Sequence, residues 1–459
     1  MMWTASQLAA ACKGTLYGPA DAKVRAVSSD TRMLDATSQS LFIGLRGENF
    51  DGDDFASGAL RSGAVGVLVH QGRVPELSDT QFAIEVDDTL YALGEIARAH
   101  LESLDATVIA ITGSNGKTTT KEMTAAALEP YGTVHKNPGN HNNRIGLPLS
   151  ALNADADVDF IVLELGMNEF GEISRLTEIC SPDVGVVVSI GAAHLEGVGT
   201  IEGVIRAKGE LYLGLQSTAV AVVAADDAHV VKAAVGTGAR VVNVGAKAHD
   251  VRVGTIRRRG VAGLTSSLTV GGSTYELELR SLARHDMRNG ALVAGILHAL
   301  GLDPAQGLRA LERHEGVDGR VDWLVASGVN IIDDTYNANP SSVASALRTL
   351  GEVAGQDRRI AVLGDMLELG PDASNLHREV GVLAADMGVD ILYAVGKHNE
   401  EIAAGFYGDN VVCANDADEI TSHLTSIVRP DDWVLVKGSR GMRMERVVHA
   451  LSQVTGGRA

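Results

Sequence analysis

The feature that most constrains this chain is a glycine-rich loop between an apolar strand pattern and a helix pattern. The strand pattern covers 107–112, and the loop reads Thr112-Gly113-Ser114-Asn115-Gly116-Lys117-Thr118-Thr119. In this setting glycines let backbone amides turn toward a phosphate, and the helix that follows adds a favourable dipole. We expect Lys117 to reach the β- and γ-phosphates of ATP and the Thr118 hydroxyl to bind Mg²⁺.

The loop is a shortened form of the common phosphate loop. That loop carries a glycine five residues before its second glycine, and here the position is Ile111. A glycine-rich turn that binds no ligand is therefore the alternative interpretation. The loop by itself indicates only a nucleotide, so the chemistry has to come from its neighbours.

Apolar strands alternate with amphipathic helices from the loop onward, which is typical of a parallel sheet covered on both faces. The central region, 106–318, has predicted strands at 107–112, 159–164, 184–190 and 219–224, helices at 118–128, 172–179, 201–214 and 289–300, and a hairpin at 264–279. Residues 319–459 repeat the pattern, with strands at 329–333, 359–363, 390–395, 411–414 and 433–437, and predict a doubly wound, Rossmann-like unit. Residues 1–105 carry short strands, closed by a helix pattern at 89–104. The prediction is an α/β chain of three domains.

Three side chains beside this loop are candidates for holding a metal. Glu164 ends an apolar strand, and His194 follows the next one, so both are expected at the same edge of the sheet. The alternatives are a capping carboxylate and an incidental loop histidine. Lys208 falls in the middle of a predicted helix, where a lysine is normally solvated, and the sequence pattern alone gives it no role.

Net charge and cysteine content indicate which kinds of partner and which cellular compartment suit this chain. The formal net charge of −19 and the absence of a Lys/Arg block beyond Arg257, Arg258 and Arg259 argue against nucleic-acid binding. Those three arginines suit a polar hairpin, and a small anionic ligand is the alternative. The three cysteines are far apart, which favours a reducing compartment. We find no secretory signal and no apolar run of about 20 residues, so a cytoplasmic protein without a membrane span is expected.

The chain resembles the Mur ligases along nearly its whole length. The resemblance rests on the loop and on seven further stretches in the same order: 139–148, 164–168, 194–196, 207–210, 319–320, 333–340 and 364–370. The strings Thr-Tyr-Asn-Ala-Asn-Pro (335–340) and Gly-Asp-Met-Leu-Glu-Leu-Gly (364–370) are most similar to the member that adds a dipeptide. The resemblance implies an ATP-dependent amide ligase that joins D-alanyl-D-alanine to UDP-N-acetylmuramoyl-tripeptide through an acyl phosphate, and we expect a monomer.

The resemblance also implies roles for each domain. The first domain, 1–105, would bind the UDP-sugar, the second, 106–318, would bind ATP, and the third, 319–459, would close and receive the dipeptide. For ATP it implies an adenine contact from Asn289, a γ-phosphate contact from Arg320 and a ribose contact from Asp334. The metal ligands would be Thr118, Glu164, His194 and a carbamylated Lys208, with Lys117, Lys208, His194 and Arg320 as catalytic residues.

Substrate-binding residues follow from the same resemblance. Those for the UDP-linked peptide are Ser29, Thr31, Arg32, Gly47, Asp51, Asn142 and Asn143, and those for the dipeptide are Asn337, Asn339, Lys437 and Arg440. Related sequences often read Asp-Gly-His where this one has Asp51-Gly52-Asp53, which leaves the hydrogen bonding there open. A cation such as Arg440 suits the dipeptide carboxylate, and a purely structural loop is the alternative.

Two other functions were weighed. Another amino-acid ligase of the same superfamily would share the ATP site, but the Asp-Asn-Pro-Arg motif of the diaminopimelate- or lysine-adding enzyme is absent, and folylpolyglutamate synthase would lack the first domain. A nucleotide-dependent switch is the alternative from a different class. A switch does not need the second metal site that Glu164, His194 and Lys208 would provide.

Overall fold

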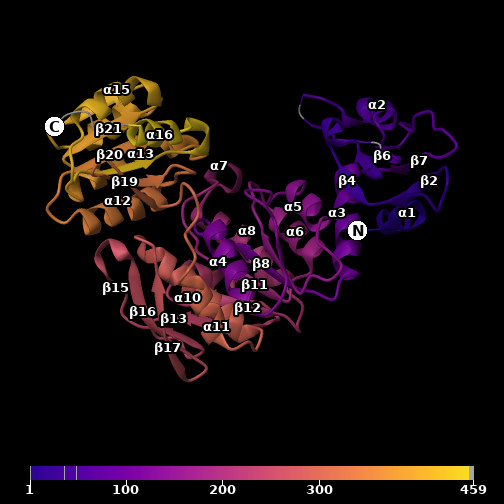
Figure 1. The fold of residues 1–459 in the computed structure, drawn as a ribbon, viewed down its shortest axis with the longest axis horizontal. Coiled ribbons are helices and arrows are strands. Elements are labelled where there is room, and N and C mark those ends of the chain that lie inside the picture. Colours follow the sequence, from indigo (N-terminus) through magenta and orange to yellow (C-terminus); the bar gives the residue numbers. More distant parts are fainter. Residues whose placement is uncertain (1, 36, 48, 454–459) are drawn as a thin grey trace.

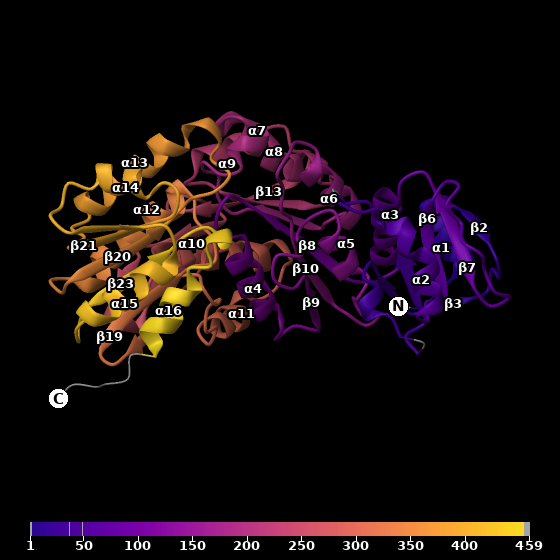
Figure 2. The ribbon, with the colours of Figure 1, turned by 90° about the horizontal axis from the view of Figure 1, so that it is seen from above.

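The computed structural model describes residues 2–35, 37–47 and 49–453, and it shows three α/β domains (Figure 1). The central domain lies between the other two in both views (Figures 1 and 2). Within the described residues the main sheets have five, ten and six strands in chain order. The predicted fold class is therefore confirmed. The boundaries at 105/106 and 318/319 stay predictions, although no sheet of the described residues crosses either of them.

The N-terminal sheet has the strand order β2-β7-β6-β5-β4, in which β4 to β7 are parallel. Its strands are β2 (Thr15–Tyr17), β4 (Ala26–Ser28), β5 (Ser40–Ile43), β6 (Gly66–His70) and β7 (Phe82–Val86), with β1 (Trp3–Thr4) and β3 (Lys23–Val24) paired separately; the helices are α1 (Ala5–Cys12), α2 (Ala56–Arg61) and α3 (Thr89–Glu102), with short 3₁₀ turns η1 (Thr31–Met33) and η2 (Gly52–Phe55). The Asp88 carboxylate accepts the amides of Leu90 and Tyr91 and so starts α3.

The central sheet has the order β15-β16-β14-β13-β12-β11-β8-β10-β9, with β17 paired to β16. Its strands are β8 (Thr107–Thr112), β9 (Val134–Lys136), β10 (Phe160–Glu164), β11 (Val184–Val187), β12 (Val220–Ala224), β13 (Arg240–Gly245), β14 (Val251–Val253), β15 (Arg257–Arg258), β16 (Leu264–Val270) and β17 (Ser273–Leu279). Strands β8 to β14 are parallel, and β15 to β17 add the antiparallel part with the predicted hairpin. Arg257 and Arg258 thus form a short edge strand.

Helices cover both faces of this sheet, as the nearly continuous apolar strands require. One face carries α4 (Lys117–Leu128), α10 (Arg284–Ala299) and α11 (Pro304–Leu311), and the other carries α5 (Gly146–Ala151), α6 (Glu172–Cys180), α8 (Ile201–Gly214) and α9 (Ala228–Ala233), with the short α7 (Leu195–Val198) beside α8. Within β8, Val108 and Ala110 pack toward one face, and Ile109 and Ile111 toward the other. Helix α3 packs on α5 and α6, so the first two domains share one core.

The C-terminal sheet has the order β18-β19-β23-β20-β21-β22. Its strands are β18 (Asp322–Ala326), β19 (Val329–Asp334), β20 (Arg359–Gly364), β21 (Ile391–Val395), β22 (Val411–Ala414) and β23 (Trp433–Lys437); α12 (Pro340–Ala354), α13 (Ala373–Asp386) and α14 (Asn399–Gly405) cover one face, and α15 (Ala417–Ile427) and α16 (Glu445–Ser452) the other. The predicted doubly wound unit is present. The antiparallel edge strand β18 was not predicted, and α10 begins five residues before the predicted helix.

No helix among the described residues combines the length and apolarity that a bilayer span requires. The three cysteines, Cys12, Cys180 and Cys413, are free thiols.

Candidate active site

The predicted phosphate loop lies where β8 passes into α4, at the carboxyl edge of the central sheet. Gly116 has a φ of +80°, and a Cβ there would approach Val188 Cγ1 to 2.9 Å and Asn289 Oδ1 to 3.0 Å. Glycine is therefore required for both conformation and space. The amides of Ser114 and Asn115 donate to the carbonyl and hydroxyl of Ser189, at 2.8 and 3.1 Å, which fixes the loop against the end of β11.

Three predicted site residues meet directly at the start of α4. Thr118 Oγ1 donates to Glu164 Oε2 at 2.7 Å and accepts from Arg320 Nη2 at 2.9 Å. Glu164 comes from β10, and Arg320 from the connection to the third domain. The structure thus brings together the hydroxyl and carboxylate predicted for Mg²⁺ and the guanidinium predicted for the γ-phosphate.

Two lysines lie close to this group. Lys117 Nζ donates to the Gly113 carbonyl at 2.9 Å, and desolvation lowers its pKa against the opposing charge of Glu164. Lys208 of α8 is completely buried, and its amine has no hydrogen-bond partner among the residues that the structure describes. Burial, with the charge of Lys117 added, holds the pKa of Lys208 well below its usual range. Lys208 is thus not the solvated helix lysine that its position in the sequence suggests.

His194 contacts a residue that the sequence analysis gave no role. Its Nδ1 lies 2.9 Å from Glu368 Oε2, and this pair joins the central domain to the third domain. The contact with His194 lowers the pKa of the Glu368 carboxyl. Glu368 belongs to the string 364–370, so the sequence could have indicated it as a site residue through that string. Its partner depends on domain docking, which a sequence does not show.

Asn289 lies against the phosphate loop at Gly116, and its predicted contact with adenine stays a prediction. It is buried, and its Nδ2 donates to Asp286 Oδ1 at 3.1 Å. A pocket beside it lies between the central and C-terminal domains and is lined by residues including Thr119, Met123, Asp286, His314, Arg320 and Trp323. The pocket is adjacent to the loop, so it has room and position for part of a nucleotide beyond the phosphates.

Asp334 and Lys437 form a buried ion pair at the carboxyl ends of β19 and β23. The Lys437 ammonium lies 2.6 Å from Asp334 Oδ2 and donates to the Asn337 carbonyl at 2.8 Å. Burial raises the pKa of Asp334, and the charge of Lys437 opposes this. The Lys437 side chain is only 2% exposed, so a direct contact with a dipeptide would require breaking this pair.

Asn339 links the third domain to the phosphate loop. Its Nδ2 donates to Asn115 Oδ1 at 2.8 Å, and its Oδ1 caps α12 by accepting the Ser342 amide at 2.9 Å. Asn115 Nδ2 also donates to Ser341 Oγ at 2.7 Å. The amide of Asn339, predicted to meet the dipeptide, is thus engaged with the ATP loop.

We expect Asn339→Ser to separate these two functions of Asn339. A serine keeps the helix cap but cannot reach Asn115, so stability should stay near the parent value. Loss of the cross-domain hydrogen bond should raise the KM for ATP about 3–10-fold, measured by steady-state kinetics. Asn339→Ala should show the same KM and lose about 1 kcal/mol of stability in urea unfolding. An unchanged KM in both variants would contradict the coupling.

Two dipeptide candidates remain accessible. Asn337 is exposed, and the Arg440 side chain is 62% exposed with Glu445 Oε1 at 3.2 Å. Tyr336 lies between two cations, with Arg320 at 4.1 Å and Arg440 at 6.0 Å from its ring centre. The ring therefore holds the γ-phosphate candidate and a dipeptide candidate close to each other.

Asn142 and Asn143 have different structural roles. Asn142 Nδ2 donates to Glu164 Oε1 at 2.7 Å, so it holds the second oxygen of that carboxylate. Asn143 Oδ1 accepts the amides of Ile145 and Gly146 at the start of α5.

The UDP-sugar candidates gather at the carboxyl edge of the N-terminal sheet. Ser29 follows β4, Thr31 and Arg32 form η1, and Gly47 and Asp51 belong to the loop after β5. Arg32 pairs with Asp30 at 2.7 Å on the surface, while Asp51 lies 3.3 Å from Arg46.

Asp53, the residue that departs from the family pattern, is buried beneath this edge. Its Oδ2 lies 2.8 Å from His70 Nδ1 and 3.6 Å from Arg46 Nη2. The carboxylate thus has an imidazole and a guanidinium as partners within the domain.

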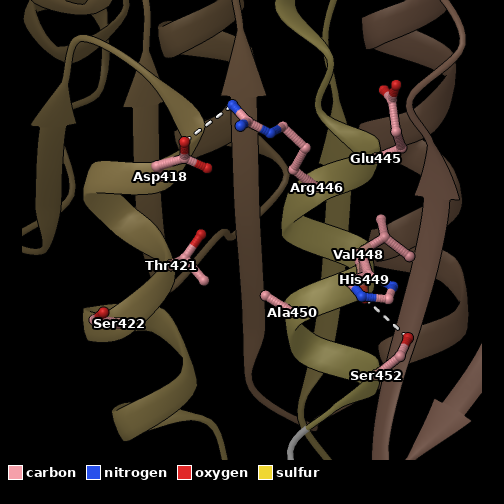
Figure 3. A pocket seen from close by; sticks show the side chains of 9 residues that line it. All are labelled: Asp418, Thr421, Ser422, Glu445, Arg446, Val448, His449, Ala450 and Ser452. Carbon is pink, nitrogen blue, oxygen red and sulfur yellow. Dashed lines mark hydrogen bonds and ion pairs between the residues drawn. The ribbon is translucent and has the colours of Figure 1, made fainter.

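A groove on the outer face of the C-terminal domain contains none of the predicted residues. It lies between α15 and α16, and Figure 3 shows Arg446 extending across it toward Asp418, 3.0 Å away.

The residues around Glu164 suit a hard divalent cation. The described residues contain no group of three His, Cys, Asp or Glu that could hold a metal ion without help. Thr118 and Glu164 do present a hydroxyl and a carboxylate at one point, and Mg²⁺ commonly takes one or two such ligands and completes its shell with phosphate oxygens and water. The donor set therefore fits a cation that arrives with a nucleotide.

Comparisons with known proteins agree along the chain. Three profiles of one family match successive stretches: "Mur ligase family, catalytic domain" at 24–101, "Mur ligase middle domain" at 111–297 and "Mur ligase, glutamate ligase domain" at 319–440. The chain is similar to the UDP-N-acetylmuramoyl-tripeptide–D-alanyl-D-alanine ligases of Bacillus subtilis, at 33% identity, and Escherichia coli, at 34%. Each alignment covers 98% of both proteins.

Solved structures give the same result. A crystal structure of MurF from Acinetobacter baumannii superposes with a TM-score of 0.91 at 28% identity, covering 99% of both chains. MurF from Thermotoga maritima in complex with ADP superposes with a TM-score of 0.85 at 29% identity, over 95% of this chain and 99% of that one.

Proposed function

The chain belongs to the Mur ligase family, and we propose that it uses ATP to join D-alanyl-D-alanine to UDP-N-acetylmuramoyl-tripeptide in peptidoglycan synthesis. The observation that carries this proposal is the meeting of Thr118, Glu164 and Arg320 at the phosphate loop. The similarity to ligases of that name extends over both whole proteins, which a nucleotide switch with unrelated partners does not explain. We assign the UDP-sugar to the N-terminal domain, ATP to the central domain and the dipeptide to the C-terminal domain.

Amide formation from a carboxylate requires its activation. In the proposed first step, a carboxylate oxygen of the tripeptide attacks the γ-phosphorus of ATP, the bond to the β-phosphate oxygen breaks, and an acyl phosphate and ADP form. Both partners are anions and repel each other. The Lys117 ammonium and the Arg320 guanidinium offset that charge and align the attack.

Thr118 and Glu164 are the proposed ligands for one Mg²⁺, with His194 and Lys208 assigned to a second. The ions would supply charge neutralisation at the transferred phosphoryl group. For Lys208 we propose a carbamate. The buried amine, which has no hydrogen-bond partner among the described residues, can be neutral and react with CO₂, and the product would be an anionic, carboxylate-like ligand.

In the second step the dipeptide amine attacks the acyl carbon, phosphate leaves, and the nitrogen loses a proton. Asn337 and Arg440 are the proposed dipeptide contacts, because both are accessible beside Tyr336. The contacts of Asn339 and Ser341 with Asn115 bring the third domain onto the loop. Such docking excludes water, which would otherwise hydrolyse the acyl phosphate.

We further propose that the protein acts as a monomer in the cytoplasm, on small molecules and not on nucleic acid. Three free thiols suit a reducing compartment, and the net charge of −19 disfavours polyanions.

The test is phosphate release with ATP, Mg²⁺, UDP-N-acetylmuramoyl-tripeptide and D-alanyl-D-alanine, omitting one component at a time. The expected result is release that needs all four, with a product that is heavier by the dipeptide residue. Release that instead needs a shorter acceptor and a free amino acid would assign the chain to another step of the family. Phosphate release that consumes no amine would support the switch.

A further inference from the structure

Asn137 is a fully buried residue that follows the edge strand β9 and has no assigned role. Strand β9 pairs with β10 only as far as Lys136 opposite Val162, so the ladder ends before Glu164. The side chain of Asn137 provides the hydrogen bonds that a continuing strand β9 would have made to Glu164. Its Oδ1 accepts the Glu164 amide at 2.8 Å, and its Nδ2 donates to the Glu164 carbonyl at 3.0 Å.

Glu164 is thereby held from both sides. On the other side β8 pairs with it at Ile111, and the Leu165 amide donates to the Ile111 carbonyl at 2.8 Å. Without the amide of Asn137, the peptide group that carries the metal-binding carboxylate would have a neighbour on one side only. A buried amide and carbonyl would also lose their partners.

Asn137 holds the carboxylate of Glu164 by a second route. Its Nδ2 also donates to the His141 carbonyl at 2.8 Å, which fixes the loop that carries Asn142. Asn142 in turn donates to Glu164 Oε1 at 2.7 Å. One side chain therefore controls both the backbone of Glu164 and the donor to its carboxylate.

A buried lysine supports this arrangement. Lys121 of α4 is fully buried, and its ammonium donates to the Asn137 carbonyl at 2.7 Å and lies 3.0 Å from Glu122. Lys121 is one turn after Thr118 in the same helix. Its hydrogen bond therefore fixes Asn137 relative to α4, which also carries Thr118, the other proposed metal ligand.

From these contacts we infer that Asn137 is a positioning residue for Mg²⁺–nucleotide binding, acting through Glu164. Groups that orient metal ligands typically change metal affinity about 10–100-fold when removed. The inference rests on the proposed function, in which Glu164 binds the nucleotide-associated cation. It assigns Asn137 no contact with substrate.

The test measures the binding of Mn²⁺ to Asn137→Ala by electron paramagnetic resonance, in the presence of a non-hydrolysable ATP analogue. We expect the Kd for Mn²⁺ to rise at least about 10-fold. In the ligase assay the Mg²⁺ concentration for half-maximal rate should rise in parallel, while kcat at saturating Mg²⁺ stays near the parent value. The binding measurement needs no ligase turnover, so a wrong acceptor assignment would leave it unaffected.

Asn399→Ala is the matched control. Its Nδ2 also bridges to a strand, donating to the Ala414 carbonyl at 2.7 Å, but it lies in the third domain. This variant should lose less stability than Asn137→Ala, because Asn399 is only partly buried, and it should keep its Mn²⁺ affinity. If Asn137→Ala does not fold, Lys121→Met decides the question, with an expected rise of about 3-fold in the Kd from the loss of one hydrogen bond. A folded Asn137→Ala or, failing that, a folded Lys121→Met with unchanged Mn²⁺ affinity would overturn the inference.

Discussion

Lys117→Ala is expected to lower kcat for phosphate release by about 10³-fold and to leave thermal unfolding unchanged. The Lys117 ammonium provides a positive charge at the phosphate loop. Removing one preorganised group that stabilises charge typically lowers kcat by about 10²–10³-fold. Within the described part of the chain the Lys117 side chain donates one hydrogen bond, to the Gly113 carbonyl, so the fold should not depend on it. Steady-state kinetics and a melting curve measure the two effects.

Lys232→Ala is the control for this experiment, because that lysine is exposed on α9. It should match the parent in rate and in melting temperature. If Lys117→Ala kept more than about a tenth of the parent rate, a phosphate-binding role for the loop would be untenable.

Lys208→Ala is expected to lose about 10²–10³-fold in rate and to regain part of it when formate or acetate is added. Loss of a metal ligand costs several kcal/mol, and each 1.4 kcal/mol corresponds to about tenfold. The truncation leaves a buried cavity where the amine stood, and a short acid can supply the carboxylate that the proposed carbamate would provide. The measurement is the rate as a function of added acid.

Lys208→Met gives the matched comparison, because its side chain fills the same buried volume. It should be equally slow and should not respond to the acid. Full activity of Lys208→Ala, or an equal response of both variants, would contradict the carbamate.

The sequence predicted the fold and the position of the phosphate loop beside Glu164, because both depend on local signals. Apolar runs and the Gly-Lys-Thr string placed β8, the loop and α4 within a residue or two. Glu164 and His194 were expected at one sheet edge because parallel strands end there. The approach of Thr118 to Glu164 at 2.7 Å follows from that geometry.

Contacts between domains were beyond the sequence. Nothing local to Asn339 indicates that its amide meets Asn115, more than two hundred residues away. The burial of Lys208 could not be predicted either, because a lysine in the middle of a helix is normally solvated and the packing of α8 is not evident from the sequence. The role of Asn137 was not predicted, because its partner, Glu164, lies on another strand. An asparagine directly after a short edge strand does, however, indicate a side chain that can replace the ladder hydrogen bonds.

The attachment of Arg320 has a consequence for energy conservation in the cell. Arg320 directly follows Gly319, whose carbonyl accepts the Tyr336 amide at 3.1 Å, and its guanidinium lies over the Tyr336 ring. It therefore travels with the third domain while acting on Thr118 of the second. A third domain that swings away takes this cation with it. Under the roles proposed for Arg320 and the third domain, nucleotide cleavage would require this domain to be docked, which would suppress ATP turnover in the absence of the amine.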